Sequence, residues 1–360
     1  MQVAAAHRDA LSGNERPRVG LVLGAGGVLG GAWLAGALHA IVSETGWDPG
    51  SADYIVGTSA GSMVGALIAS GMPPWFIVEC SAGETFDGLT DIRLRRRGVV
   101  PWPGSWRLAL ASLSRPSQYS PMVMIAGWLP QGIVSTEPLK GVVRGACASG
   151  WTPHPNFWPV AVDYTTGRRV AFGRAGSPKA ELPDAVAASC AIPGFYRNVE
   201  INGRSYVDGG VHSASNIDLL HNEPLDAVVA LNPMSPLRLR PPRNVAERLA
   251  HAIRKESARR LVWEAERLRA AGIQVVLIQP TAHDMDAMGS DLMSERLRHE
   301  VVQTAVGTTT RQLREAPVGA RLAQLARHDR RLPWCPGEPQ PDAASSSGAA
   351  DARGTGARAA

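Results

Sequence analysis

Residues 54–70, YIVGTSAGSMVGALIAS, contain the pattern that decides the fold. A short β-branched run precedes Gly57-Thr58-Ser59-Ala60-Gly61, and an uncharged stretch rich in Ala, Leu and Met follows it. This order predicts a strand, a sharp turn and a helix, the setting of a G-x-S-x-G nucleophile elbow. Gly57 and Gly61 lack a Cβ where strand and helix approach closely, and the turn would hold the Ser59 backbone under strain. The alternative is a serine that only caps the helix.

A glycine loop lies one strand-helix unit upstream of the elbow. Residues 18–23, RVGLVL, predict a strand, the loop runs from Gly24 to Gly31, and a helix is predicted over residues 32–43. Amides at a helix start bind anions, so nucleotide phosphate is one candidate ligand. The loop lacks the Lys-Ser/Thr of a P-loop and the acidic residue that a dinucleotide fold requires. Beside a serine on the next strand, the same amides could stabilise an oxyanion.

The rest of the chain alternates strand and helix patterns. Strands are predicted over residues 159–164, 168–172, 198–201, 204–207, 227–232 and 273–279, and helices over 181–191, 245–271 and 291–313. One broad apolar face is expected on the helix over 245–271, formed by Val245, Leu249, Ile253, Leu261, Ala265 and Leu268. An Asn202-Gly203 turn marks a hairpin that ends in Asp208-Gly209-Gly210. Asp208 is therefore either an aimed acidic side chain or a turn-forming one.

Composition bounds the class of protein. The chain has 360 residues, 44% of them hydrophobic, which suits one extended domain. Four cysteines are scattered without metal-ligand spacing, so we expect reduced thiols and a cytoplasmic protein. Residues 1–18 do not resemble a signal peptide. Uncharged runs at 20–43 and 54–78 reach the length of a membrane span, about 20 residues, but their glycine breaks favour buried strand-loop-helix units.

An insert at about 87–131 has the weakest pattern. It combines Arg93, Arg95, Arg96 and Arg97 with Trp102 and Trp106. Such a segment could contact an anionic membrane peripherally, with indoles at the interface. It could also be a solvated charged loop, or a lid over an active site.

Four elements in this order resemble the patatin-like phospholipase family: the glycine loop, the G-x-S-x-G elbow, residues 188–193 (ASCAIP) and Asp208-Gly209-Gly210. The resemblance covers about residues 18–314. It implies a three-layer α/β/α fold with a mostly parallel central sheet, and a serine acyl hydrolase with a Ser-Asp dyad and no histidine. It also implies roles for Ser59 as nucleophile, Asp208 as base, Gly24, Gly26 and Gly27 as oxyanion hole, and Gly57, Gly61 and Gly209 as elbow and turn glycines.

Two positions depart from the family loop, which runs Gly-Gly-Gly-x-Arg/Lys-Gly. Ala25 stands for its first glycine and Leu29 for its basic residue. Burial of Asp208 would raise the pKa of its carboxyl and make it a stronger base for Ser59. No cofactor, metal ion or nucleic acid is expected, and the expected substrate is a lipid ester of the phospholipase A or lysophospholipase type.

The predicted domain plan has a disordered segment over 1–17, a catalytic domain over 18–316, a C-terminal extension over 317–334 and a disordered tail over 335–360. Three alternatives remain open. A Ser-His-Asp hydrolase could combine Ser59 with Asp163 or Asp226 and with His251, His283 or His299. The chain could be an inactive lipid-binding relative, or a nucleotide-binding protein that uses the glycine loop.

Overall fold

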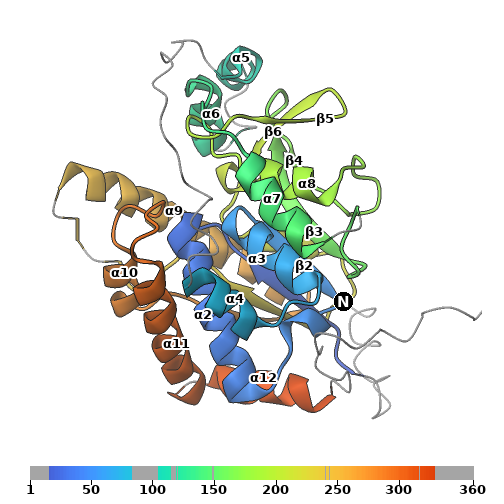
Figure 1. The fold of residues 1–360 in the computed structure, drawn as a ribbon, viewed down its shortest axis with the longest axis vertical. Helices are drawn as coiled ribbons and strands as arrows, with labels where there is room; N and C mark the ends of the chain where they lie inside the picture. Colours follow the sequence, from blue (N-terminus) through green and yellow to red (C-terminus); the bar gives the residue numbers. More distant parts are fainter. Residues whose placement is uncertain are drawn as a thin grey trace, which may run out of the picture.

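A mixed, mostly parallel sheet forms the middle of the molecule (Figure 1). The computed structural model describes residues 16–82, 104–114, 119, 121–147, 150–239, 241–242, 244–315 and 317–328. Within these ranges eight strands form one sheet in the order β5-β6-β3-β2-β1-β7-β8, with β4 also paired to β3. The segments predicted to be disordered at the two ends lie largely outside the described residues. Residues 87–103 of the insert also lie outside them.

Five parallel strands occupy the centre and one side of the sheet. They are β1 (Val19–Leu23), β2 (Tyr54–Thr58), β3 (Phe157–Asp163), β7 (Ala227–Leu231) and β8 (Gln274–Ile278). Antiparallel pairing adds β4 (Arg169–Ala171), β5 (Val199–Ile201) and β6 (Arg204–Asp208) beyond β3. The predicted strands and the hairpin at the Asn202-Gly203 turn are confirmed, with strand bounds that shift by two residues or fewer.

Helices cover both faces of the sheet, because strands such as β1 present apolar side chains on both faces. Its side chains alternate, so Leu21 and Leu23 pack against α2 (Gly27–Thr45), α3 (Ala60–Ala69) and α11 (Arg298–Glu315). Val22 points to the other face, where Leu261 and Leu268 of α9 (Val245–Ala270) pack. The predicted three-layer α/β/α fold is confirmed.

Shorter helices complete the layers. These are α4 (Pro74–Ala82), α7 (Glu137–Ala146), α8 (Leu182–Ser189), α10 (Ala282–Met288) and α12 (Pro317–His328). The helices α5 (Trp106–Ser114) and α6 (Pro121–Trp128) lie at one end of the molecule, the top of Figure 1. In α12, within the predicted C-terminal extension, Leu322 is fully buried in the core shared with α2 and α11.

Three helix predictions need correction. The first helix starts at Gly27 rather than residue 32, so the glycine loop supplies its first turn. The last predicted helix starts at Arg298 rather than residue 291, because residues 291–297 form turns that cover the glycine loop, where the Leu292 carbonyl accepts a hydrogen bond from the Leu29 amide at 3.0 Å. Leu249 is 66% exposed, because α9 packs on the sheet mainly through its C-terminal half.

The two uncharged runs belong to the buried core. Residues 20–43 form most of β1 and α2, and residues 54–78 include β2, α3 and the start of α4. None of the helices within the described ranges combines the length and apolar character that crossing a bilayer requires.

Candidate active site

Ser59 lies in a strained turn between β2 and α3. Its backbone adopts φ 53° and ψ −122°, a region that a side chain with a Cβ rarely occupies. The turn is held from three sides: the Ser59 amide donates to Ser189 Oγ at 3.0 Å, and the Ser59 carbonyl accepts from Ser62 Oγ at 2.7 Å and from Cys190 Sγ at 3.2 Å. These contacts hold the strained turn in place and leave the side chain to line a cavity.

Close backbone contacts explain the glycines around this turn. A Cβ on Gly61 would overlap the Leu23 carbonyl of the neighbouring strand, and a Cβ on Gly57 would press on Ser62 in α3. On the other side of the site, a Cβ on Gly209 would overlap the Val160 carbonyl of β3. Any larger residue would push the elbow away from the sheet at these positions.

Asp208 ends β6, and its carboxyl is buried beside Ser59. Both residues are 4% exposed although they lie far apart in the sequence. The Gly210 amide donates to Asp208 Oδ1 at 2.7 Å, and the Ser59 side chain is a second hydrogen-bond partner of this carboxyl. Burial raises the pKa of Asp208 from its ordinary 3.8 to about 7, and the two hydrogen bonds only partly offset that rise. The fold therefore places a carboxyl of unusually high basicity next to the serine.

The amides of the glycine loop divide into two groups. The Gly24 amide donates to the Leu231 carbonyl at 2.9 Å and the Ala25 amide to the Ala214 carbonyl at 2.8 Å, so neither is a free donor. For Gly24 this is against the prediction. Gly26 caps α2 and Gly27 opens it, so their amides belong to the helix start, which favours negative charge. The roles of the Gly26 and Gly27 amides as donors to an oxyanion remain predictions.

Sequence reasoning missed Ala60 and Val28 in this region. Ala60 is the first residue of α3, directly after Ser59, and Val28 is in the first turn of α2. Both line the same cavity as Ser59 and Gly27. The signal was present for Ala60, since the amide after the nucleophile is a recurrent oxyanion donor in nucleophile elbows.

Leu29 accounts for the missing basic residue of the loop. Its side chain is fully buried in the core formed with α2, α3 and α11, and its amide donates to the Leu292 carbonyl. A cation at this position would be buried at high cost. The loop conformation is supported instead by apolar packing and by the turns over residues 291–297.

The cavity beside Ser59 is small and mostly apolar. It measures about 120 Å³. Apolar side chains from α2, α3, α4, α7 and later segments make up most of its wall, and Arg298 supplies the charge among its described lining residues; the apolar members include Val28, Met63, Val64, Leu67, Ile77, Leu139, Ile192 and Met293. Such a wall accommodates a hydrocarbon chain better than a nucleotide.

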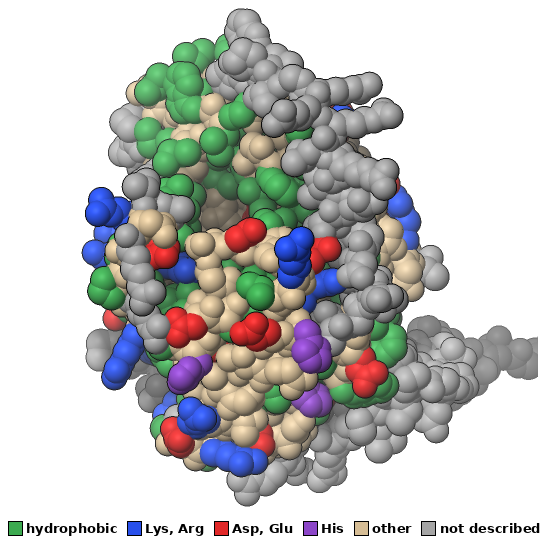
Figure 2. Space-filling view, turned by 60° about the vertical axis from the view of Figure 1, so that its left-hand side comes forward, with side chains coloured by type: hydrophobic (Ala, Val, Ile, Leu, Met, Phe, Trp, Pro, Cys, Tyr) green, Lys and Arg blue, Asp and Glu red, His purple; other side chains and the backbone are tan. Residues whose placement is uncertain are grey.

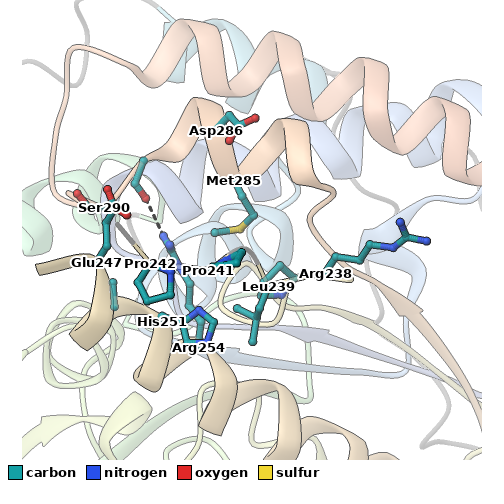
Figure 3. A pocket seen from close by; sticks show the side chains of 13 residues that line it. Arg238, Leu239, Pro241, Pro242, Glu247, His251, Arg254, Met285, Asp286 and Ser290 are labelled. Atoms are coloured by element: carbon teal, nitrogen blue, oxygen red, sulfur yellow. Dashed lines mark hydrogen bonds between the residues drawn. The ribbon is translucent and has the colours of Figure 1, made fainter. Parts of the chain in front are cut away.

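A larger cavity of about 640 Å³ lies elsewhere, between the start of α9 and α10 (Figure 3). Arg254 Nη2 donates to the Gly289 carbonyl there at 2.8 Å, and the Arg238 guanidinium points away from it (Figure 3). Its lining mixes cations with Glu247 and Asp286 and does not include Ser59, which lines the smaller cavity. We therefore place the candidate chemistry in the smaller cavity.

The structure does not assemble the alternative Ser-His-Asp triad. The Asp163 carboxyl accepts from the Thr165 and Thr166 amides and pairs with Arg204 at 3.1 Å, while Asp226 accepts from the Arg18 amide at 2.7 Å. His251 lines the larger cavity, and His283 and His299 are exposed. Among the described residues that line the Ser59 cavity there is no histidine.

Asn216 is a further residue of the site that sequence reasoning missed. It is fully buried with a φ of 53°, and its Nδ2 donates to Thr58 Oγ1 at 3.0 Å and to the Ser213 carbonyl at 2.7 Å, with the Gly209 carbonyl at 3.5 Å. Its Oδ1 accepts from Arg169 at 3.0 Å. Thr58 precedes the candidate nucleophile and Gly209 follows the candidate base. One amide therefore joins the two strand ends.

The part of the chain that the structure describes contains no cluster of three or more His, Cys, Asp or Glu side chains arranged to hold a metal ion. Cys80 and Cys190 are free thiols, the Cys147 thiol donates to the Trp151 carbonyl at 3.1 Å, and Cys335 lies outside the described residues. Burial, followed by the nearby Asp208 charge, raises the pKa of the Cys190 thiol to about 12, which disfavours its thiolate.

Comparisons with known proteins found similar sequences and similar solved structures. Uncharacterized NTE family proteins of Mycobacterium tuberculosis and Mycobacterium bovis are each 29% identical to this chain over 258 residues, which is 68% of this chain and 58% of theirs. The chain thus spans less than two thirds of the length of these relatives. Among solved structures, VipD from Legionella pneumophila matches with a TM-score of 0.42 and 14% identity, covering 84% of this chain and 67% of that one.

A second solved structure, the type III effector protein ExoU, matches with a TM-score of 0.33 and 16% identity over 87% of this chain and 54% of that one. TM-scores this low do not support a family assignment. The match to a family model does support one. The model described as patatin-like phospholipase matches residues 21–221, more than half of the chain, and this range contains the glycine loop, the elbow and Asp208. The chain belongs to the patatin-like phospholipase family.

Proposed function

We propose that this protein is a serine hydrolase that cleaves fatty-acyl esters of lipids, in the manner of a phospholipase A or lysophospholipase. One observation carries the proposal: the buried Asp208 carboxyl, with its pKa raised to about 7, has the Ser59 side chain as a hydrogen-bond partner. A carboxyl of ordinary pKa would be a poor base for a serine near neutral pH, and the raised pKa removes much of that difficulty.

The reaction would proceed in two halves. Ser59 Oγ attacks the ester carbonyl carbon while its proton passes to Asp208, and the tetrahedral oxyanion receives hydrogen bonds from amides at the starts of α2 and α3. The intermediate collapses to an acyl-enzyme, and the leaving alcohol takes the proton from Asp208. Water then attacks the acyl-enzyme, Asp208 accepts its proton, and Ser59 regains a proton as the fatty acid leaves.

The cavity supports a lipid as the source of the acyl group. Its apolar wall beside Ser59 suits a hydrocarbon chain, and Arg298 at the same cavity suits an alcohol that carries a phosphate. Both features favour a phospholipid or lysophospholipid over a small soluble ester.

The test is an activity screen over a panel of phospholipids, lysophospholipids and neutral glycerides. Wild type should hydrolyse at least one class, and Ser59→Ala should lose turnover by at least about a thousandfold because the nucleophile is gone. A matched control is Ser70→Ala at the end of the same helix, since the buried Ser70 hydroxyl has no hydrogen-bond partner among the described residues. Unchanged turnover in folded Ser59→Ala would refute the assignment. A folded wild type that neither turns over nor reacts with a fluorophosphonate would favour an inactive lipid-binding relative.

A further inference from the structure

The outer face of α5 and α6 is an exposed apolar surface, which we call the apolar end face. Its six side chains are each between 37% and 60% exposed: Trp106, Leu110 and Leu113 of α5, Ile125 and Trp128 of α6, and Leu129 directly after α6. Figure 2 shows hydrophobic side chains gathered around a hollow in the upper part of the molecule, at the height where α5 and α6 lie in Figure 1. A concentration of this kind marks an interaction site.

The opposite faces of the same helices are well packed. Leu108, Val123 and Ala126 are buried against Val207 and Val211, which flank Asp208 on either side in the chain. A hydrogen bond from the Tyr164 hydroxyl to the Ala126 carbonyl at 2.8 Å ties α6 to the end of β3. The apolar end face is therefore a fixed surface one helix layer away from the candidate base.

The same helices lead directly to the cavity. Six residues after α6 ends, the Val134 amide donates to the Phe195 carbonyl at 3.1 Å, and Val134 bridges to Tyr196. Tyr196 lines the cavity beside Ser59. The segment that follows α6 therefore connects the apolar end face to the wall of the cavity beside Ser59.

Charge in the sequence identifies the kind of surface that would be bound. Residues 88–136 contain six arginines and one aspartate, a net charge of +5, which equals the net charge of the whole chain. The remaining residues are therefore balanced overall. Within the apolar end face, the Arg107 guanidinium lies 5.9 Å from the Trp106 ring centre. Indole rings suit the interface of a bilayer, and arginines suit its anionic phosphates.

We infer that the apolar end face docks this protein on the surface of a bilayer that contains anionic lipid. This inference rests on the proposed function only in one respect: docking would bring Ser59 to its lipid substrate. Binding to the bilayer itself requires no turnover. Docking inserts the six apolar side chains at the headgroup boundary and brings the exposed Arg107 guanidinium to the phosphates.

The test measures vesicle binding of full-length Ser59→Ala protein, so that hydrolysis cannot change the vesicles. Sedimentation is compared for phosphatidylcholine vesicles with and without phosphatidylglycerol, at low and high salt. We expect binding that requires phosphatidylglycerol and weakens with salt. Adding Leu110→Gln and Trp128→Gln should weaken it by at least about tenfold, because two large apolar side chains are lost.

The matched control adds Leu249→Gln and Trp263→Gln instead. These side chains of α9 are 66% and 52% exposed, and Arg267 lies over the Trp263 ring as Arg107 lies over Trp106. The control should bind vesicles like the parent. Equal binding by the two double variants would overturn the inference, as would a concentration-dependent dimer that only Leu110→Gln with Trp128→Gln disrupts, since the face would then join two copies of the chain.

Hydrolysis of a short soluble ester, measured with Ser59 restored, separates this inference from the proposed function. The Leu110→Gln and Trp128→Gln enzyme should retain that activity, because neither side chain lines the cavity. Vesicle binding without any esterase activity in the wild type would contradict the proposed function and leave the docking surface standing. Esterase activity without vesicle binding would do the reverse.

Discussion

Burying Asp208 costs the folded protein stability at neutral pH. Its pKa in the folded state is about 7 and its ordinary value is 3.8, so between these values the folded state holds a proton that the unfolded state has lost. The contribution of this group to the free energy of unfolding therefore falls as pH rises from about 4 to about 7. A purely structural aspartate in a favourable ion pair would behave in the opposite way.

Asp208→Asn should therefore be more stable than wild type at pH 8, by up to about 4 kcal/mol, and close to wild type at pH 4. Urea unfolding at the two pH values measures the difference. Asp163→Asn is the matched control, because its equally buried carboxyl pairs with Arg204 and accepts two backbone hydrogen bonds. That variant should lose stability. An Asp208→Asn protein less stable than wild type at pH 8 would contradict the proposed environment of the carboxyl.

Asn216 is the second residue whose contacts predict a measurable effect. Asn216→Ala removes the donor shared by Thr58 and the Ser213 carbonyl, together with the acceptor of Arg169, so the relative positions of Ser59 and Asp208 should loosen. We expect kcat/KM on a soluble ester to fall by about ten- to a hundredfold, and the free energy of unfolding by about 1–3 kcal/mol.

Asn202→Ala controls for the backbone cost, since Asn202 has a similar φ of 52° but lies exposed in the β5–β6 turn. It should keep its kcat/KM. If Asn216→Ala lost stability but kept full kcat/KM, Asn216 would be structural only. A fall of equal size in both variants would point to backbone strain rather than to the Asn216 hydrogen bonds.

At the scale of elements, local sequence patterns predicted the strands and missed several helices. β-branched runs and the Asn202-Gly203 turn determine strand positions locally, and the elbow was legible because its glycines are required by contacts within one strand-helix unit. The helices α5 and α6 were not predicted, since they are short and one face of each remains apolar and exposed. The late start of α11 depends on a contact from Leu292 to Leu29, which no local pattern contains.

Helix α3 supplies part of the apolar cavity wall, because Met63, Val64 and Leu67 line the cavity. Leu67→Trp would fill part of the roughly 120 Å³ beside Ser59. We expect kcat/KM for long-chain esters to fall at least about tenfold while a butyryl ester is cleaved nearly as well, which a chain-length series measures in one enzyme. An equal loss on all chain lengths would indicate damage to the elbow rather than a shortened cavity.

For the whole molecule, the sheet brings the candidate site together from distant parts of the sequence. Order along the chain was enough to suggest Ser59 and Asp208, because each follows a predicted strand and accompanies glycines. The use of each amide was not predictable: the Gly24 amide pairs with β7, which is more than two hundred residues further along. Asn216 and Cys190 reach the elbow only through the tertiary fold.

The most direct test of the central claim is the rate at which a fluorophosphonate reacts with Ser59, followed by mass spectrometry across pH 5 to 9 in wild type and in Asp208→Asn. If Asp208 is the base, wild type should be labelled at Ser59 with a rate that rises through about pH 7, where this carboxyl loses its proton. Folded Asp208→Asn should react at least about a hundredfold more slowly and without that rise. Equal rates and equal pH profiles in the two proteins, or labelling at another serine, would contradict it.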